Sequence, residues 1–323
     1  MSKARRIVKR RKDSVELVHA VAQELTTETA ITIATQAFKA EGYRQRTIND
    51  YSKLFKYFMR EVSVDKVEII KEAHIQTYIH KLLNRGLSPA TVNIRVSALK
   101  AVFKRLYSRG YISNNPTDDF IKLRTDEPKI FTLNSNQLKR IFRVVDKDTY
   151  AGYRDYCAML LMLHCGLRVN EVNSLEINDI DFDNLSIMLA GAKNKNRKTR
   201  AIPITGKVAE ELKTLIDESK EYFKDLRYVF LTQEGKPVDN DLIRKRMYRY
   251  GQLAGLHEEC RPSPHSLRHT FATNFLRNGG SINALMRIMG HADITTTMRY
   301  VRLNDEEVKE QFNRVAYKSV YDV

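Results

Sequence analysis

The sequence contains few of the residues from which disulfide scaffolds and zinc modules are built. Its 323 residues include three cysteines, Cys157, Cys165 and Cys260, and these lack the paired spacing of metal ligands. An odd number of scattered cysteines argues against a disulfide framework and favours a reducing compartment, the cytoplasm. We therefore expect stability to come from ordinary apolar cores.

Long apolar segments are also missing. The longest run, 157–163, is far shorter than the ~20 residues that span a bilayer, and the basic start of the chain is not followed by the apolar stretch of a signal peptide. The sequence has neither a phosphate-binding glycine loop nor an acidic metal cluster. These absences predict no membrane contact, no nucleotide and no metal cofactor.

Positive charge, in contrast, is abundant. The chain has 55 Lys and Arg against 39 Asp and Glu, a net charge of +16, which favours a polyanionic partner. A merely soluble basic protein is the alternative, but the charge is clustered. The segment 3–12 is rich in Lys and Arg without any acidic residue, and a second basic cluster occupies 193–200. Neutralising several phosphates in this way would make binding depend strongly on salt.

Helical patterns dominate the first part, 30–120, and the chain is long enough for two domains. The clearest helix begins at Ser88-Pro89, a cap followed by a proline, and carries an apolar stripe as far as Gly110. Weaker patterns cover 31–40, 47–61 and 72–83. The basic residues off the stripe either contact phosphate or face water, and they include Arg95, Lys100 and Lys104. We predict a domain of four or five helices.

A linker is predicted at 121–132, where charge and a proline occur without a sustained period. A new helix then starts near Asn134, with Gln137 completing a capping box. This places a second domain at 133–323. The basic tail, 1–29, would contact DNA, mediate assembly or be disordered.

Short β-like stretches in the second domain predict a small sheet. They cover 181–185, 186–190 and 201–204. The basic cluster 193–200 then forms an exposed hairpin tip that reaches a ligand or is simply solvated. A helix at 239–250 either enters a DNA groove or lies on a solvated surface. Its basic residues are Arg244, Lys245, Arg246 and Arg249.

A helical run at 262–278 presents His265 and Arg268 three residues apart, on one side of its first turn. Together with the helix dipole, such a pair can bind a phosphoryl group. His265 and His269 also have a spacing that metal sites use. With only Cys260 nearby and no acidic partner, we predict no metal site.

Three motifs follow one another in the second domain: Gly166-Leu167-Arg168-x-x-Glu171, Pro264-His265-x-Leu267-Arg268-His269, and Gly290-His291 with Tyr300 nine positions later. In this order they resemble the motifs of the tyrosine recombinases, the integrase family that includes the Xer recombinases and lambda integrase. The segment 30–120 is similar to the family's core-binding domain. The resemblance implies a mainly α fold with a small antiparallel β-sheet. It also implies a two-domain DNA clamp, in which an α-helical SAM-like domain precedes an α+β catalytic domain.

The resemblance also implies a role for each motif residue. Tyr300 would attack a backbone phosphodiester and become linked to the 3′-phosphate, although a phenol with a pKa near 10 needs assistance. Arg168 and Arg268 would bind the non-bridging oxygens. His265 would act as general base toward Tyr300 or hold the phosphate, and His291 would add a hydrogen bond to it.

Two further residues complete the predicted site. Lys195, eight positions before Pro203 in the family's hairpin pattern, would protonate the leaving 5′-oxygen. Glu171 would orient Arg168. The neighbouring Lys193 and Lys198 are predicted DNA contacts, and either of them is an alternative for the catalytic lysine.

The expected partner is double-stranded DNA with partially inverted-repeat sites. A homotetramer would assemble on this DNA from monomers or dimers, and the resemblance leaves room for accessory DNA-bending or directionality proteins. An amphipathic helix at 305–319 would dock on a neighbouring subunit or fold back on its own domain. Such a protein would be encoded by a phage or mobile element, or would serve chromosome resolution, and it would be associated with the bacterial nucleoid.

Two other functions stay open. A non-catalytic DNA-binding transcriptional regulator, a repressor built on the same fold, would keep the basic surface without cutting DNA. A topoisomerase of the related single-strand type uses similar residues, but the helical first domain and short length favour a recombinase. A covalent protein–DNA adduct that requires Tyr300 would distinguish the recombinase from the regulator.

Overall fold

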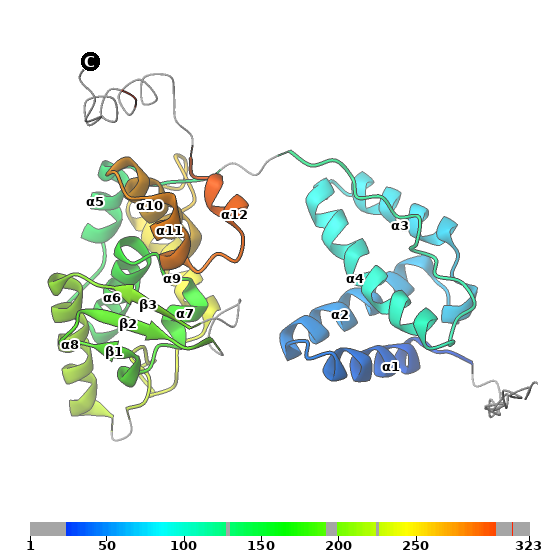
Figure 1. The fold of residues 1–323 in the computed structure, drawn as a ribbon, viewed down its shortest axis with the longest axis horizontal. Coiled ribbons are helices and arrows are strands. Elements are labelled where there is room, and N and C mark those ends of the chain that lie inside the picture. Colours follow the sequence, from blue (N-terminus) through cyan, green and yellow to red (C-terminus); the bar gives the residue numbers. More distant parts are fainter. Residues whose placement is uncertain (1–23, 127–129, 192–198, 224–225, 302–311, 313–323) are drawn as a thin grey trace, which may run out of the picture. The chain divides into compact units, whose positions relative to one another are not determined.

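A computed structural model describes residues 24–126, 130–191, 199–223, 226–301 and 312, and the chain divides into two compact units, Met1–Glu127 and Pro128–Val323 (Figure 1). Most elements are helices, and the strands form one three-stranded antiparallel sheet. The predicted fold class, mainly α with a small antiparallel sheet, is confirmed. Within the described ranges, no helix combines the length and the apolar character needed to cross a membrane.

The N-terminal unit is a bundle of α-helices. Its described elements are α1 (Thr27–Ala40), α2 (Gln45–Val62), a short 3₁₀ turn (Val67–Ile69), α3 (Glu72–Asn84) and α4 (Pro89–Ser108). Aromatic side chains fill its centre in edge-to-face contacts: Phe103 meets both Phe55 and Phe58, and Phe58 meets Tyr78. Such pairs add about 0.5–1.5 kcal/mol each to the free energy gained from burial.

Helix α4 contacts α1, α2 and α3. It begins as predicted, because Ser88 Oγ accepts a hydrogen bond from the Thr91 N–H (3.3 Å) and Pro89 is the first helical residue. The predicted apolar stripe is buried along its whole length: Val92, Val96, Leu99, Phe103 and Leu106. At about 1.5–3 kcal/mol for each fully buried side chain, this stripe is a major source of the unit's stability.

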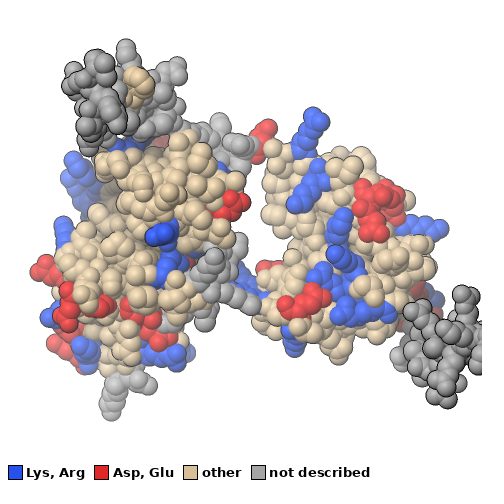
Figure 2. Space-filling view, in the orientation of Figure 1, with Lys and Arg blue, Asp and Glu red and all other residues tan. Residues whose placement is uncertain are grey.

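The predicted DNA contacts on α4 differ in their surroundings. The Arg95 guanidinium lies 5.0 Å from the centre of the Tyr57 ring, and Lys100 Nζ donates to the Asp118 carbonyl (3.4 Å). Lys104 is exposed. Figure 2 shows Lys and Arg side chains standing out from the visible face of this unit among smaller acidic groups. DNA contact by these three residues stays a prediction.

The C-terminal unit is built around α6 (Tyr150–His164), which is buried along most of its length and contacts α7, α8 and α10. The other described helices are α5 (Ser135–Arg143), α7 (Val169–Asn173), a 3₁₀ turn (Ile177–Asp179), α8 (Gly206–Tyr222), α9 (Asn240–Leu253), α10 (Pro264–Arg277), α11 (Ile282–Met289) and α12 (Ile294–Met298). The predicted capping box at the start of α5 is present, because Asn134 and Gln137 each accept the other's backbone N–H.

The sheet has the order β1 (Ile180–Asp181), β2 (Ser186–Leu189) and β3 (Arg200–Pro203). Ile187 pairs with Ile180 on one side and with Ile202 on the other, and the side chains of all three are buried. Strands at 186–190 and 201–204 were predicted nearly in place. The predicted tip of the β2–β3 hairpin was 193–200. Its residues 193–198 lie outside the described residues, and Arg200 belongs to β3 rather than to the tip.

One predicted strand is wrong. The stretch 181–185 forms a turn beyond the two-residue β1, because the Asp181 carboxylate accepts hydrogen bonds from the backbone and side chain of Asn184. Leu185 then adopts a φ of 46°, which ends the extended conformation. Three helices, α8, α11 and α12, were not predicted at all. The predicted helix 305–319 lies outside the described residues except for Phe312.

Gly166 lets the end of α6 approach α10 closely. Its φ is +65°, and a Cβ at this position would lie 2.4 Å from Cδ1 of Phe271. The Gly166 carbonyl accepts a hydrogen bond from Arg268, which, like Phe271, belongs to α10. Only a residue without a side chain allows this approach, so Gly166 positions Arg268 through the backbone.

Replacing Gly166 with alanine should destabilise the C-terminal unit by about 3 kcal/mol, because left-handed strain adds to the overlap with Phe271. Gly255→Ala is a matched control: its φ is also +65°, but its new Cβ would meet only the end of Arg140, at 3.2 Å. We expect about 1 kcal/mol for this control. Urea unfolding followed by circular dichroism measures both values, and equal losses would contradict the close approach.

Candidate active site

Arg168 and Glu171 form the start of α7, a helix of five residues. Arg168 is the N-cap residue, and both its backbone N–H and its Nη1 donate to the Glu171 carboxylate, at 2.9 Å each. Glu171 is only 1% exposed, whereas the Arg168 side chain is 21% exposed. The buried carboxylate therefore fixes Arg168 from the interior of the unit, and part of the guanidinium stays open to solvent.

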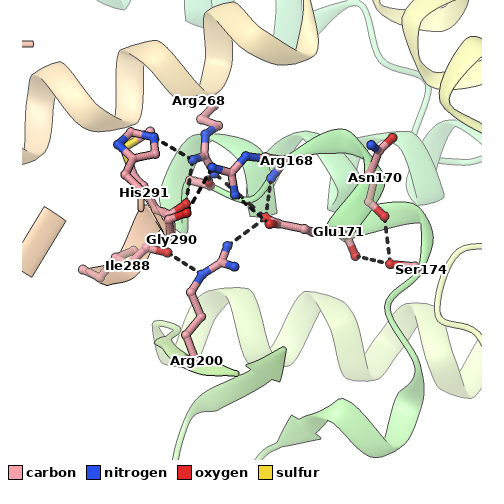
Figure 3. Close-up of polar contacts among 11 residues, drawn as sticks. Arg168, Asn170, Glu171, Ser174, Arg200, Arg268, Ile288, Gly290 and His291 are labelled. Atoms are coloured by element: carbon pink, nitrogen blue, oxygen red, sulfur yellow. Dashed lines mark hydrogen bonds and ion pairs between the residues drawn. The ribbon is translucent and has the colours of Figure 1, made fainter. Parts of the chain in front are cut away.

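Glu171 binds more than one arginine (Figure 3). Arg200, the first residue of β3, donates from Nη2 to Glu171 Oε2 at 2.8 Å, and Arg268 Nη1 lies 3.9 Å from the same oxygen. Burial alone would raise the pKa of Glu171, but hydrogen bonds and charge from Arg200 and Arg168 lower it below its ordinary value. Three guanidiniums thus surround one charged carboxylate, which leaves a net positive site.

Arg268, on α10, ties several segments together. It donates to the Gly166 carbonyl at the end of α6 and to the Met289 carbonyl at the end of α11 (2.7 Å). Its side chain is 5% exposed. Burial and the charge of Arg168 lower the pKa of Arg268 to about 9, which keeps the guanidinium charged at neutral pH. Arg168 reaches the same region through a bond from Nη2 to the Gly290 carbonyl (3.3 Å).

His291 lies between Arg268 and Thr297 of α12. Its Nε2 is 3.2 Å from Arg268 Nη2, and its Nδ1 is 2.8 Å from Thr297 Oγ1. Because a guanidinium has no lone pair to offer, Nε2 accepts and the ring hydrogen is on Nδ1. Burial and the nearby arginines lower the pKa of His291 to about 3, so the ring is neutral. A phosphodiester oxygen only accepts, so the predicted hydrogen bond from Nε2 to a phosphate requires the ring hydrogen to move to Nε2 and the bond from Arg268 to be lost.

Tyr300 follows α12 directly. Its ring lies nearly parallel to His291, at an angle of 10° and a centroid distance of 6.4 Å. It packs against a small apolar cluster formed by Ala272 of α10 and by Leu285 and Met289 of α11. Burial raises the pKa of Tyr300, while nearby arginines partly offset this effect, so the hydroxyl is protonated at neutral pH. A neighbouring base is needed to make it a nucleophile.

That neighbour is His269, a residue to which the sequence analysis gave no role. Its Nδ1 lies 2.7 Å from Tyr300 Oη. The predicted partner, His265, is exposed at the second position of α10, with its ring centre 6.3 Å from that of His269. The H-x-L-R-H spacing puts both histidines on one face of the helix, so the sequence contained a signal for His269 but no means of choosing between the two.

Arg200 is the second residue whose role sequence reasoning missed, since it counted only as one of a basic cluster. Its Nε donates to the Ile288 carbonyl (2.9 Å) as well as holding Glu171. These bonds fix the base of the β2–β3 hairpin beside Arg168 and Arg268. The predicted hairpin residues lie outside the described part of the chain, namely Lys193, Lys195 and Lys198.

The predicted basic face of α9 is divided. Arg246 donates from Nε to the buried Asp155 (2.5 Å) and from Nη2 to Tyr250, so it stabilises packing of α9 on α6 rather than standing free for DNA. Arg244 is paired with Asp241 at 3.1 Å, while Lys245 and Arg249 are exposed. No group of three or more metal-ligating side chains occurs among the residues that the structure describes.

Glutamine at position 171 should destabilise the C-terminal unit, because the guanidiniums would lose the charge that balances them. Removing one partner of a buried ion pair costs about 3 kcal/mol. The folded-state pKa of Glu171 lies below the ordinary value of 4.5, so the carboxylate's contribution is complete above that pH and is lost as the pH falls through the folded-state pKa. The difference in unfolding free energy between wild type and Glu171→Gln should therefore shrink in acid.

Urea denaturation at a series of pH values measures this difference. Glu259→Gln, which breaks the solvent-exposed pair with Arg140, is the control and should show a much smaller difference at neutral pH. A Glu171→Gln difference that stays constant between neutral pH and acid would show that the carboxylate's charge does not stabilise the site.

Comparison with known proteins extends over both units. The sequence model of the phage integrase family matches residues 132–307. The sequence model of the phage integrase N-terminal SAM-like domain matches residues 32–112. The chain is 26% identical over 280 residues to tyrosine recombinase XerD of Staphylococcus haemolyticus, covering 85% of this chain and 93% of that relative. It is also 26% identical to tyrosine recombinase XerC of Oceanobacillus iheyensis, covering 84% and 90%.

Solved structures share the fold. The Tn1549 transposon integrase in complex with a circular intermediate DNA matches with a TM-score of 0.72 at 22% identity, covering 90% of this chain and 100% of that one. A lambda integrase dimer bound to a COC′ core site matches with a TM-score of 0.70 at 17% identity, covering 88% and 80%. The predicted pairing of a SAM-like domain with an integrase-type domain is thus confirmed. With a family model that spans more than half of its length, the chain belongs to the phage integrase family, the tyrosine recombinases.

Proposed function

We propose that this protein is a site-specific DNA recombinase that cuts and rejoins strands through a covalent bond between Tyr300 and a 3′-phosphate. The observation that carries the proposal is a continuous set of contacts from nucleophile to phosphate-binding groups. The ring of Tyr300 stacks on His291, whose Nε2 accepts from Arg268. Glu171 in turn links Arg268 with Arg168.

The charge of the site suits phosphoryl transfer. Arg168, Arg200 and Arg268 bring three positive charges to one carboxylate, Glu171, so the cluster has a net charge of +2 when the histidines are neutral. A phosphodiester carries one negative charge, and attack by a phenolate adds a second as the bond to phosphorus forms. The site therefore neutralises the transition state more completely than the bound substrate, which is the condition for catalysis.

The two arginines would divide the work of binding. Arg168 is the more exposed and would contact the non-bridging oxygens directly, whereas the buried Arg268 would contribute its charge and one edge of its guanidinium. Lys195, on the hairpin whose base Arg200 holds, would protonate the 5′-oxygen as it leaves. The reaction needs no nucleotide or metal, because the phosphotyrosine bond conserves the energy used when a 5′-hydroxyl attacks.

Double-stranded DNA is the proposed substrate. The matching Tn1549 and lambda integrase structures are DNA complexes, as is XerH bound to a palindromic difH substrate, with a TM-score of 0.66 at 22% identity and coverage of 90% of this chain and 85% of that one. The net charge of +16 fits the same partner. The proposed DNA contacts are Arg95, Lys100, Lys104, Lys193, Lys198, Arg244, Lys245 and Arg249.

Assembly follows from the same proposal. The N-terminal unit would act as the core-binding domain, and four protomers would join two partially inverted-repeat sites. Both a phage or mobile-element integrase and a chromosome-resolution enzyme are compatible with Xer relatives and integrase folds. In either case the protein would act on the bacterial nucleoid.

Tyr300→Phe should abolish the covalent adduct while leaving DNA affinity unchanged. A bound site is first selected from a random duplex pool and then nicked a few nucleotides beyond the scissile phosphate, so that the short 5′-hydroxyl fragment diffuses away. Wild type should form a denaturant-resistant protein–DNA adduct on this duplex, and Tyr300→Phe should form none. Tyr248→Phe, an exposed tyrosine of α9, is the control. Wild type that binds the site but forms no adduct would instead support a non-catalytic regulator.

Lys195→Ala should slow adduct formation by about 10²-fold or more, the usual contribution of a general acid. A duplex with sulfur in place of the bridging 5′-oxygen tests the role, because a thiolate leaves without protonation. This substrate should restore the rate of Lys195→Ala and leave the defect of Arg168→Ala in place. Lys193→Ala and Lys198→Ala are matched controls from the same loop. If the sulfur-containing duplex restores the rate of Lys193→Ala or Lys198→Ala instead, that lysine is the general acid.

A further inference from the structure

The hydroxyl of Tyr300 has a specific partner in the free protein. Its Oη lies 2.7 Å from Nδ1 of His269, and no second hydrogen bond to this oxygen occurs among the residues that the structure describes. Burial raises the pKa of Tyr300, so the oxygen keeps its hydrogen and requires an acceptor. His269 Nδ1 is correctly placed to be that acceptor, since a neutral imidazole carries one free lone pair.

The surroundings of His269 keep its ring neutral. Burial lowers its pKa to about 4, and nearby positive charges add to the shift. These charges come from His265 and Arg268 on the same helix and from Arg299 beside Tyr300. The positive charges of Arg268 and Arg168 also favour a lower pKa for Tyr300, against the effect of burial. A bound phosphodiester would offset the arginine charges, which raises the pKa of His269 toward neutrality and makes it a stronger base when substrate is present.

We propose that His269 is the general base that takes the proton of Tyr300 during strand cleavage. The inference rests on the proposed function, because the phenol loses its proton only as it attacks phosphorus. The proton moves from Oη to His269 Nδ1 while the bond from Oη to phosphorus forms. The bond from phosphorus to the 5′-oxygen breaks, and this oxygen takes a proton from Lys195. During rejoining, a 5′-hydroxyl bonds to phosphorus and gives its proton to Lys195, while the bond from phosphorus to Oη breaks and His269 returns its proton to Oη.

Helix α10 then separates two tasks along one face. His265 and Arg268 lie on the first turn, and His269 follows at the i+4 position of His265. His265 is exposed and makes its ring contact with His269 rather than with the tyrosine. It therefore remains available to hold a phosphate oxygen, whereas the proton of the nucleophile goes to the next turn.

Asparagine and alanine at position 269 distinguish a base from a structural support. The side-chain oxygen of asparagine lies close to the position of a histidine Nδ1, so His269→Asn can still accept a hydrogen bond from Tyr300 but cannot take its proton at neutral pH. His269→Ala can do neither. Adduct formation on the selected, nicked duplex is followed in a single turnover across a range of pH, at saturating protein. Added imidazole tests chemical rescue of His269→Ala.

We expect His269→Asn to cleave about 10²-fold more slowly than wild type at neutral pH, with unchanged DNA binding. Its rate should continue to rise with pH as the phenolate fraction grows, whereas the wild-type rate should level off once His269 is unprotonated. Imidazole should accelerate His269→Ala and leave His269→Asn unaffected.

Two results would overturn the proposal while leaving the recombinase function intact. One is a His269→Asn rate within about threefold of wild type, since a general base contributes at least about 10²-fold. The other is a slow His269→Asn enzyme whose pH profile has the wild-type shape, which would mean that His269 only positions Tyr300. If wild type itself forms no adduct on bound DNA, the proposed function fails first, and the two failures are thereby distinguished.

Discussion

A single buried carboxylate allows the positive site of this protein to exist. Glu171 accepts hydrogen bonds from Arg168 and Arg200, and Arg268 lies within 3.9 Å. Without it, like charges at these separations would repel one another in surroundings that water screens poorly. The three arginines come from α7, β3 and α10, so the carboxylate also fixes how a helix start, a hairpin and a long helix meet. Both the electrostatics of the site and its geometry depend on this group.

Tyr300, the proposed nucleophile, is held by different forces. Tyr300 lies on an apolar cluster at the end of α12, stacks on His291 and hydrogen-bonds to His269. This arrangement keeps the phenol protonated in the free protein, next to a neutral base and close to charged arginines. A buried phenol is a weak nucleophile, so under the proposed mechanism the protein would stay unreactive until a phosphate enters and changes the charge balance. Reactivity would therefore be coupled to DNA binding by electrostatics rather than by a cofactor.

Local signals in the sequence predicted much of the fold, and contacts between distant segments account for what was missed. The Ser88 cap and the Asn134–Gln137 box mark helix starts correctly, because capping involves only neighbouring residues. Helix α8 also has a cap, Thr205, that would have predicted it. His269 rather than His265 contacts Tyr300 because of where the distant helix α12 places the tyrosine. Arg200 points into the site because it pairs with Glu171 of another segment. Similarly, Arg246 belongs to a basic run that suggests a DNA surface, yet a buried aspartate of α6 binds it. No local pattern contains these pairings.

The proposed mechanism depends on which atom of the protein bonds to DNA. Mass spectrometry of the nuclease-trimmed, proteolysed adduct from wild-type protein and its nicked duplex measures this most directly. We predict one modified peptide, with a nucleotide 3′-phosphate on the oxygen of Tyr300. A nucleotide on a different side chain, or a bond to a 5′-phosphate, would contradict the mechanism.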